Sequence, residues 1–293
     1  MVKVKECKHI NECDSIQERF IKDDYIINDC LICEHRYTKI DRELHDHLAS
    51  TYNDHYFFGG KDGYPDYFQE KDILIEHGHK YAKRIAKFKP TGTVLDVGSA
   101  SGFVLKGFIE KGWKGEGVEP NTSMVNYGKT DLGLTITNSS FEDFKSDKKF
   151  DLISMIQVVG HFYDLDKVIK KSYDLLKDDG LLLIESWDKN SIPAKILNKN
   201  WHEYSPPSVL HWFSKSSIVN VFAQHNFSPV KFGKPKKKIA IKHAFTLMEN
   251  KSNSKLVKKI LSIVSRSFIS KFKVLYPPLD IFWVIFEKKK HHE

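Results

Sequence analysis

Short apolar runs alternate with amphipathic stretches along most of the chain. Charged residues and turn formers bound the runs, as they bound the buried strands of a parallel sheet. The stretches between them place apolar residues three and four positions apart, which is typical of helices with one buried face. Strands are expected at residues 94–97, 115–118, 134–136, 150–156, 181–185, 227–232 and 279–286. Helices are expected at residues 69–88, 103–111, 123–129, 166–176 and 215–225.

This alternation predicts a parallel sheet whose strands are joined by right-handed helical crossovers. An insertion of two helical stretches, at about 239–250 and 254–272, separates the last two strands. The second stretch is basic and amphipathic, with Leu256, Val257 and Ile260 among its apolar positions. We interpret it as a lid or a dimer face, and the alternative is a peripheral contact with a membrane surface.

The segment from Thr93 to Pro120 contains a strand, a glycine turn, a helix and a second strand that ends on an acid. Gly98 and Gly102 bracket the turn, so a ligand can approach the backbone closely. The start of the helix offers free N–H groups to an anionic group, and Glu119 can accept hydrogen bonds from ribose hydroxyls. The segment therefore predicts a nucleotide-binding site.

The spacing of the glycines decides which nucleotide is expected. A dinucleotide-binding turn has the pattern Gly-x-Gly-x-x-Gly, whereas this turn has only Gly98 and Gly102, with three residues between them. That spacing, followed by the sequence Gly-Val-Glu-Pro at 117–120, resembles the class I S-adenosylmethionine-dependent methyltransferases. The resemblance implies an α/β fold with a Rossmann-like, mostly parallel sheet whose seventh strand is antiparallel. It also implies S-adenosylmethionine as the cofactor.

The resemblance also assigns roles to individual residues. It implies that the turn after Asp96 surrounds the methionyl part of the cofactor, that Glu119 holds the ribose, and that residues after the third strand contact the adenine. Gln157 follows the fourth strand and is expected beside the reaction site, because ligands of open α/β sheets bind at the carboxyl ends of the strands. The expected cofactor-binding residues are Asp96, Gly98, Ser99, Gly102, Glu119, Pro120, Ser140, Phe141 and Gln157.

Three side chains are candidate catalytic bases. His161 follows the fourth strand, and an imidazole has an ordinary pKa of about 6.5, which suits proton transfer near neutral pH. Many relatives carry an acid directly before this histidine, but here the position is Gly160, so an acid–histidine pair is not expected. His202 and Tyr204 lie in an aromatic insertion after the fifth strand that resembles the substrate-facing loop of the family. The alternative for each of the three is a structural role.

The cysteines suggest a metal site near the N-terminus. Clustered thiolates suit a structural zinc ion in a reducing compartment. The last pair has the spacing of a zinc knuckle, whereas the first pair is wider, so His9 or His35 could replace one ligand. The arrangement resembles the zinc-binding ribbon that precedes the core in some bacterial methyltransferases, including sugar methyltransferases. Reduced structural cysteines are the alternative. The expected ligands are Cys7, Cys13, Cys30 and Cys33.

We expect three parts in the chain. A zinc-binding ribbon is predicted at 1–40, an aromatic connector with a lead-in helix at 41–89, and a methyltransferase core at 90–293 with a helical insertion at about 239–275. The connector is rich in tyrosine, and its function is expected to be either a flap over the cofactor or a hinge that packs the ribbon onto the core.

Composition excludes several classes of protein. With 41% hydrophobic and 29% charged residues, the 293-residue chain has the composition of a soluble globular protein. It contains no apolar run of about 18 residues, and its first residues lack the apolar stretch of a signal peptide, so we expect a cytoplasmic protein without a transmembrane segment. The net charge of +8 permits an acidic partner, although many of the lysines gather near the C-terminus, where solvated faces are common.

The function expected from these features is methyl transfer to a small-molecule or sugar acceptor, either free or linked to a nucleotide or lipid. Because such a transfer is an in-line displacement, the protein must mainly align the two reactants. Methylation of RNA or protein is an alternative. The Asn/Asp-Pro-Pro-aromatic signature of base methylation is absent at residues 156–159, so nucleic acid is not the expected partner. A non-catalytic scaffold that retains the fold is a third interpretation.

Overall fold

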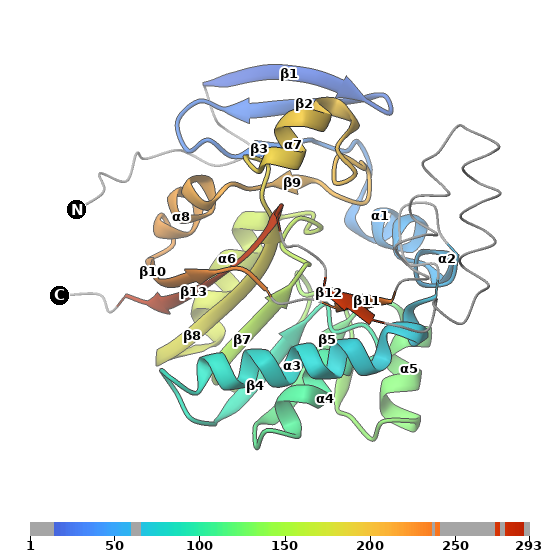
Figure 1. Ribbon diagram of the computed structural model, residues 1–293, viewed down its shortest axis with the longest axis vertical. Coiled ribbons are helices and arrows are strands. Elements are labelled where there is room, and N and C mark those ends of the chain that lie inside the picture. Colours follow the sequence, from blue (N-terminus) through green and yellow to red (C-terminus); the bar gives the residue numbers. More distant parts are fainter. Residues whose placement is uncertain (1–14, 60–65, 236–237, 241–272, 276–278, 290–293) are drawn as a thin grey trace. The chain divides into compact units, whose positions relative to one another are not determined.

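We describe the protein from a computed structural model, which covers residues 15–59, 66–235, 238–240, 273–275 and 279–289 (Figure 1). Short 3₁₀ turns lie at Tyr67–Glu70 and Asn198–Asn200. The α-helices of the described residues are α1 Leu44–Thr51, α2 Asp54–Phe57, α3 Lys71–Ile85, α4 Phe103–Ile109, α5 Thr122–Thr130, α6 Leu165–Leu175, α7 Ile192–Leu197 and α8 Lys215–Ala223.

Within these ranges, seven strands form one twisted sheet in the order β10-β13-β8-β7-β4-β5-β6. All neighbours pair in parallel except β13, which is antiparallel to both β8 and β10. This confirms the predicted Rossmann-like, mostly parallel sheet with an antiparallel seventh strand. The strands are β4 Thr93–Val97, β5 Lys114–Glu119, β6 Ile136–Asn138, β7 Phe150–Ile156, β8 Leu176–Trp187, β10 Phe227–Gly233 and β13 Ile281–Lys288.

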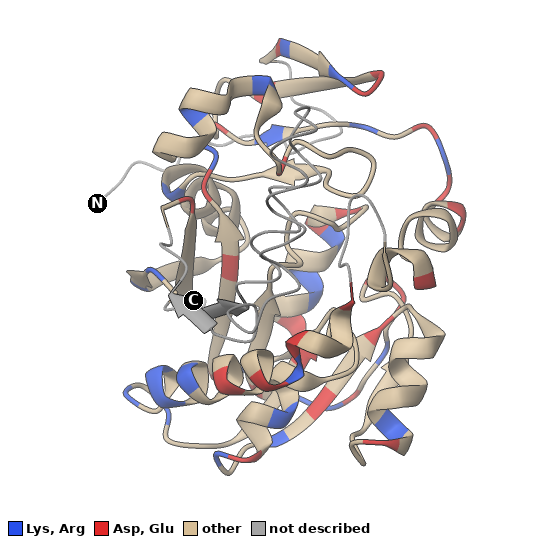
Figure 2. Cartoon of the chain, turned by 45° about the vertical axis from the view of Figure 1, so that its right-hand side comes forward, with Lys and Arg blue, Asp and Glu red and all other residues tan. Residues whose placement is uncertain are grey.

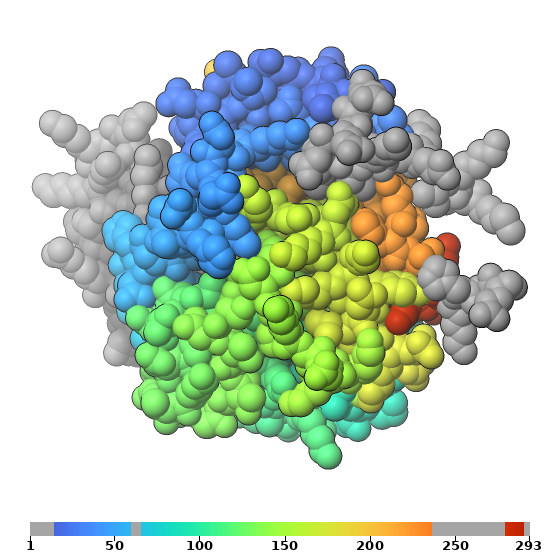
Figure 3. All heavy atoms as spheres, turned by 180° about the vertical axis from the view of Figure 1, so that it is seen from behind, coloured from blue at the N-terminus to red at the C-terminus, as the bar shows by residue number. Residues whose placement is uncertain are grey.

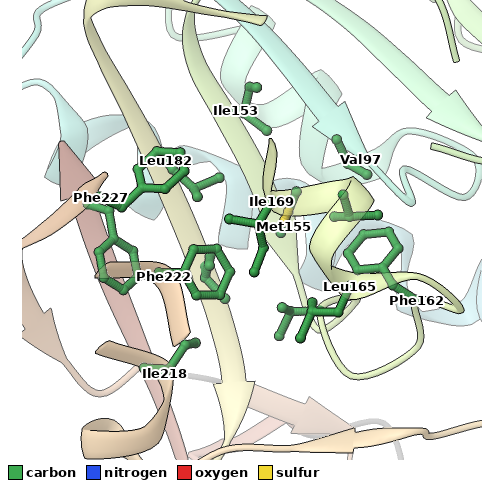
Figure 4. Close-up of a cluster of buried hydrophobic side chains, with 14 of the residues drawn as sticks. Val97, Ile153, Met155, Phe162, Leu165, Ile169, Leu182, Ile218, Phe222 and Phe227 are labelled. Atoms are coloured by element: carbon green, nitrogen blue, oxygen red, sulfur yellow. The ribbon is translucent and has the colours of Figure 1, made fainter. Parts of the chain in front are cut away.

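Both faces of the sheet are covered by helices, because successive side chains of a strand point to opposite sides. On one face, apolar residues of β4, β7 and β8 pack against α6 and α8, and Figure 4 shows part of this cluster, including Met155, Ile169 and Phe222. On the other face, Leu181 and Leu183 pack with residues of α3 and α4. The sheet is therefore the middle layer of a three-layer core.

Two glycines let α3 and α4 approach closely. A Cβ on Gly78 would lie 2.2 Å from the carbonyl oxygen of Val104, and one on Gly107 would lie 2.4 Å from the carbonyl oxygen of Ile75. Real Cβ atoms do not approach backbone oxygens this closely, so a side chain at either position would force the helices apart. Glycine weakens a helix by about 1 kcal/mol relative to alanine, and the close packing here requires it nonetheless.

The N-terminal region forms part of a second sheet. The described residues contribute β1 Ile16–Lys22, β2 Tyr25–Cys30 and β3 Arg36–Tyr37, and the fourth strand of this antiparallel sheet is β9 His211–Trp212. Because β9 lies in the insertion after β8, this sheet is completed by a segment far along the chain. The sheet therefore does not close within residues 1–40, and the domain boundaries at residues 40 and 89 stay a prediction.

The loop after β7 is joined to the segment before β9. The carbonyl of Gly160 accepts hydrogen bonds from the N–H groups of Leu210 and His211, at 2.7 and 3.0 Å. A Cβ on Gly160 would lie 2.9 Å from the carbonyl oxygen of His211. This position therefore needs glycine because a second backbone lies against it.

Three expectations about secondary structure need correction. The expected strands do not include β1, β3 or β9. Residues 177–180 lie within β8, where its pairing with β7 is irregular, whereas the expected strand begins only at residue 181. Residues 238–240 form strand β11, where a helix is expected from about 239. The rest of the two predicted insertion helices lies outside the described residues.

The described residues fall into two compact units. One contains those up to Lys234 together with those from Leu279 onward, and the other contains those between Pro235 and Pro278. In the second unit, β11 Lys238–Ala240 pairs antiparallel with β12 Lys273–Leu275. None of the described helices combines the length and apolar character needed to cross a bilayer.

We predict that Gly78→Ala destabilises the protein by about 1–3 kcal/mol, because overpacking at the α3–α4 contact outweighs the gain in helix propensity. Urea unfolding monitored by circular dichroism measures the change. Lys83→Ala, on the exposed side of α3, is the control and should change stability by less than about 0.5 kcal/mol. A Gly78→Ala variant as stable as the wild type would contradict the close packing of the two helices.

Candidate active site

The turn between β4 and α4 has a left-handed backbone at several positions. Gly98 and Gly102 have φ angles of +65° and +80°, and Ala100 between them has a φ of +46°. A Cβ on Gly98 would lie 2.5 Å from Cγ2 of Val158. A Cβ on Gly102 would lie 2.5 Å from Cδ1 of Leu134. Both conformation and packing therefore require the two glycines that the sequence singles out.

Glu119 ends β5 and is almost fully buried beside this turn. Its Oε2 accepts the N–H of Ala100 and its Oε1 accepts the N–H of Asn121, each at 2.9 Å. Burial raises the pKa of Glu119 to about 7, although the two N–H groups favour the charged form. The carboxyl group therefore fixes the glycine turn against the end of β5 and titrates near neutral pH.

Asp96 lies in β4 just before the turn and is also buried. Its Oδ1 accepts the hydroxyl of Ser154 on β7 at 2.5 Å. Burial raises the pKa of Asp96 to about 7, and the hydrogen bonds from Ser154 and from the backbone of Leu105 only partly oppose this. The structure thus places the two predicted acids on adjacent strands at the same edge of the sheet, because β4 and β5 pair in parallel.

A cavity of about 880 Å³ opens beside Pro120 and Asn121, the two residues that follow Glu119. This volume lies within the roughly 300–1,000 Å³ typical of small-molecule sites. Residues after β5 and β6 form one wall, and the connector around α1 and α2 forms the other. Figure 3 shows the blue surface of the connector lying against the green surface of those segments. The lining includes two predicted cofactor residues, Pro120 and Ser140.

Hydrogen bonds tie the connector to this wall. The Asn121 side chain donates to the carbonyl of Tyr52 at 3.0 Å and to Oδ1 of Asp54 at 3.1 Å. Ser123 donates to Oδ2 of Asp54 at 2.9 Å. The sequence points to the connector as a candidate flap but does not single out Tyr52 or Asp54. Their only signal is the tyrosine-rich composition, which does not say which residue faces the site.

The two residues predicted to contact adenine differ in their surroundings. Ser140 lines the cavity and donates its hydroxyl to Asp143 at 2.9 Å. Phe141 is buried, and its ring packs against Phe144 and Phe162 in the core. The ring of Phe141 therefore fills the core at this position, and an adenine contact would involve its backbone.

His161 lies at the junction of the loop after β7, the connector and the segment before β9. Its Nδ1 lies 2.6 Å from the carbonyl oxygen of Ser208, which can only accept, so Nδ1 carries the proton. The hydroxyl of Tyr52 donates to the same carbonyl at 2.6 Å and lies 3.2 Å from Nδ1. Burial lowers the pKa of His161 below its ordinary 6.5, although nearby backbone carbonyls oppose this. The ring is therefore neutral at pH 7, with its lone pair on Nε2.

The other two candidate bases lie elsewhere. Tyr204 is buried among Trp201, Trp212 and other apolar residues, its hydroxyl accepts from Arg36, and burial raises its pKa. His202 packs its ring edge-on against Trp187 and lies 3.3 Å from Glu203. Arg36 also forms a two-point ion pair with Asp29 on β2 at 2.7 and 2.6 Å. These contacts favour structural roles for Tyr204 and His202 in the second sheet.

Gln157 adopts an unusual conformation at the end of β7, with a φ of +58°. Its Nε2 donates to Oε1 of Glu185 at 2.8 Å. Sequence reasoning does not identify Glu185, because its only signal is an acid at the end of an apolar strand.

The zinc site is not shown by the structure. Among the residues that are described, no cluster of three or more His, Cys, Asp or Glu side chains could hold a metal ion. Cys30 and Cys33 are buried, and the N–H of Cys33 points to Sγ of Cys30 at 3.5 Å. Cys7 and Cys13 lie outside the described residues.

The chain matches a known protein family and several curated relatives. A family model described as "Methyltransferase domain" matches residues 71–231, which is 161 of the 293 residues. The ubiquinone biosynthesis O-methyltransferase of Pelagibacter ubique is 28% identical over 170 residues, covering 52% of this chain and 68% of that protein. The protein of the same description from Bradyrhizobium diazoefficiens is 23% identical over 134 residues, covering 42% and 49%. The chain thus spans about half to two thirds of these relatives.

Solved structures show the same fold. A Haloferax volcanii complex between the Trm112 methyltransferase activator and a methyltransferase described as putative contains a chain that superposes with a TM-score of 0.58 at 14% identity, covering 86% of this chain and 100% of that one. Burkholderia thailandensis 1,6-didemethyltoxoflavin-N1-methyltransferase, solved with S-adenosylhomocysteine, gives a TM-score of 0.54 at 12% identity, covering 94% and 100%. At such identities the likeness extends to the fold alone.

We predict that Glu119→Gln weakens the binding of S-adenosylhomocysteine about 10- to 100-fold, because hydrogen bonds to a charged carboxylate contribute about 1.5–3 kcal/mol. Isothermal titration calorimetry measures the change. Glu116→Gln, on the same strand and paired with Lys148, is the control and should bind as the wild type does.

We also predict that the affinity of the wild type for S-adenosylhomocysteine, measured by the same titration, depends on pH. Ribose hydroxyls form stronger hydrogen bonds to the ionised carboxylate than to the protonated acid, so binding favours loss of the Glu119 proton, and affinity should fall as pH drops below about 7. Glu119→Gln removes this dependence. Equal slopes in both proteins between pH 5.5 and 8 would show that Glu119 does not receive the ribose.

Proposed function

The chain belongs to the methyltransferase domain family and is an S-adenosylmethionine-dependent methyltransferase, and from this premise we propose that it methylates a hydroxyl group of a small-molecule acceptor. The observation that supports a hydroxyl acceptor is the geometry of His161. The descriptions of the two O-methyltransferase relatives agree with it.

The residues around the glycine turn fit the cofactor. Gly98 and Gly102 give the turn its left-handed backbone, and Glu119 offers acceptors for the ribose. The cavity beside Pro120 and Asn121 has room for a nucleoside. When bound there, the cofactor supplies a methyl group made electrophilic by its sulfonium. The chain itself contributes alignment and exclusion of water, which account for much of the rate in such displacements.

A hydroxyl acceptor needs a base, because a neutral alcohol or phenol is a weak nucleophile until its proton leaves. His161 is neutral at pH 7, and its Nδ1 is committed to the carbonyl of Ser208. Nε2 is therefore the nitrogen that can take the acceptor's proton. An amine that is already unprotonated at pH 7, such as an aromatic amine, would not require such a base, since its nitrogen lone pair is free to attack.

Tyr52 holds this arrangement in place from the connector. Its hydroxyl donates to the same carbonyl as His161, and its ring meets the His161 ring edge-on, with centroids 5.8 Å apart. Burial raises the pKa of Tyr52 well above its ordinary value of 10, so the phenol stays neutral and remains a donor. The connector thus serves both as a wall of the cofactor cavity and as a support for the base.

Charge distribution supports a small-molecule acceptor over a nucleic acid. Figure 2 shows Lys and Arg interleaved with Asp and Glu along the described ribbon. A nucleic-acid-binding face would gather positive charge along one surface.

A structural zinc ion is part of the proposal for the N-terminal region, with Cys7, Cys13, Cys30 and Cys33 as ligands. Support comes from the turn after β2, where two buried thiols and a backbone N–H directed at sulfur form half of a tetrahedral site. Four protein ligands would leave no open position, so the ion would stabilise the fold and take no part in the transfer.

We predict that the purified protein contains about one zinc ion per chain and that Cys30→Ser with Cys33→Ser removes it. Plasma mass spectrometry measures the content, and thermal unfolding with a chelator measures the loss of stability. A wild-type protein without zinc, and with a melting temperature insensitive to the chelator, would leave the cysteines as buried thiols.

We predict that His161→Asn lowers kcat by roughly 10²-fold or more while leaving S-adenosylhomocysteine binding within about threefold of the wild type. The asparagine amide can still donate to Ser208 but cannot accept a proton. Transfer of labelled methyl to 3,4-dihydroxybenzoate and to a set of sugar nucleotides identifies an acceptor and measures the rate.

The pH profile provides a second readout. Because the base acts when neutral, kcat/KM of the wild type should rise with pH through a value below 6.5 and then level off. His225→Ala, paired with Asp166 at the end of α8, is the control. Undiminished turnover in His161→Asn would remove the base from the mechanism, and cofactor binding without turnover on any acceptor would indicate a scaffold.

A further inference from the structure

Glu185 on β8 carries a buried carboxyl group that lies against Gln157. Glu185 has no solvent exposure, and its oxygens accept hydrogen bonds from side chains of two other elements. The hydroxyl of Tyr81 on α3 donates to Oε2, and Nε2 of His77 on the same helix lies 3.1 Å from that oxygen. The other donor is Nε2 of Gln157, at the end of β7, which donates to Oε1.

The alternation along β8 explains why an acid can stand there. Leu181 and Leu183 face α3 and α4, and Glu185 is the next residue on that side. A buried carboxylate is tolerated only where donors surround it, since desolvation otherwise costs several kcal/mol. A strand residue that only filled the core would be apolar, so this acid points to a role beyond packing.

Glu185 can act on the site through its hydrogen bond with the side chain of Gln157. A carboxylate can only accept hydrogen bonds, so it selects the NH₂ end of the Gln157 amide and fixes which way the amide is turned. The backbone also holds this residue, because the N–H of Gln157 donates to the carbonyl of Glu185 at 2.9 Å. With Nε2 directed at Glu185, the amide oxygen Oε1 points away from it. The Gln157 side chain is partly exposed.

Gln157 also lies next to the glycine turn. The adjacent residue, Val158, packs so closely on Gly98 that a Cβ there would be 2.5 Å away. Since β4 and β7 pair in parallel, their carboxyl ends lie at the same edge of the sheet. Gln157 thus lies at the edge of the sheet where, under the proposed function, the sulfur-bearing end of the cofactor is held.

We propose that Glu185 is a positioning residue that turns the Gln157 amide so that Oε1 faces the sulfonium of S-adenosylmethionine. The inference rests on the proposed function and adds to it a device that distinguishes the charged cofactor from its neutral product. A carboxylate behind the amide polarises it, which makes Oε1 more negative and favours a cation. S-adenosylhomocysteine has no charge on sulfur and gains little from the contact.

The test compares the two ligands in variants of the pair. In Glu185→Gln, the new amide can donate to Oε1, so the Gln157 amide can turn and present NH₂ to the sulfonium. Calorimetric titration should show S-adenosylmethionine binding about tenfold weaker and S-adenosylhomocysteine binding changed by less than about threefold. Glu110→Gln is the matched control, because Glu110 pairs with His79 of α3 at 2.7 Å on the exposed side of the helix. It should leave both affinities unchanged.

A double-mutant cycle separates positioning from a general structural effect. Gln157→Met removes the amide at similar size and should weaken S-adenosylmethionine selectively. Adding Glu185→Gln to that variant should then cause no further change in the ratio of the two affinities. The inference would be overturned if Glu185→Gln bound the two ligands with the wild-type ratio of affinities. It would also be overturned if adding Glu185→Gln to Gln157→Met still changed that ratio.

The remaining outcomes are also decisive. If Glu185→Gln does not fold, the ratio of the two affinities in Gln157→Met is the test. A ratio equal to that of the wild type then overturns the inference. If the wild type binds neither ligand, the proposed function falls and takes the inference with it. If the wild type binds both and only the ratio fails to respond, the inference falls and the function stands.

Discussion

The surroundings of His161 depend on one pair of hydrogen bonds, in which the carbonyl of Gly160 accepts the N–H groups of Leu210 and His211. The same segment also accepts the N–H of Thr38 through the Leu210 carbonyl, so it lies between the core and the second sheet. His161 follows Gly160 directly in the chain. Ser208, whose carbonyl is hydrogen-bonded to His161, lies two residues before Leu210. A side chain at Gly160 would separate these backbones and with them His161 and Ser208.

The buried acids of the site are stabilised in different ways. Glu119 is satisfied by two backbone N–H groups, Asp96 by a hydroxyl from the neighbouring strand and the backbone of Leu105, and Glu185 by side chains from a helix and a loop. Backbone donors cannot rotate away, so the Glu119 carboxyl is the most rigidly held of the three. The arrangement shows a site organised before ligand arrives, which lowers the ordering that binding must supply.

How far the sequence predicts this structure depends on how local each signal is. The glycine turn and Glu119 are predictable because conformation and chemistry are set within one short segment, and the seven strands because each carries its own apolar run. β3 and β9 have two residues each, too few for any period, and their pairing is decided by tertiary contacts. For the same reason the sequence cannot distinguish Tyr204, whose hydroxyl meets Arg36, from a catalytic tyrosine.

The pairing of β3 with β9 has a consequence for synthesis on the ribosome. Arg36 pairs with Trp212, so 212 − 36 = 176 residues separate partners in one small sheet. At roughly 5–20 residues per second, the N-terminal hairpin waits about 9–35 s for its last strand to emerge. During that interval the edge of the sheet stays open, and an open edge is a template for pairing with other chains. The nascent chain is therefore exposed to such pairing until β9 arrives.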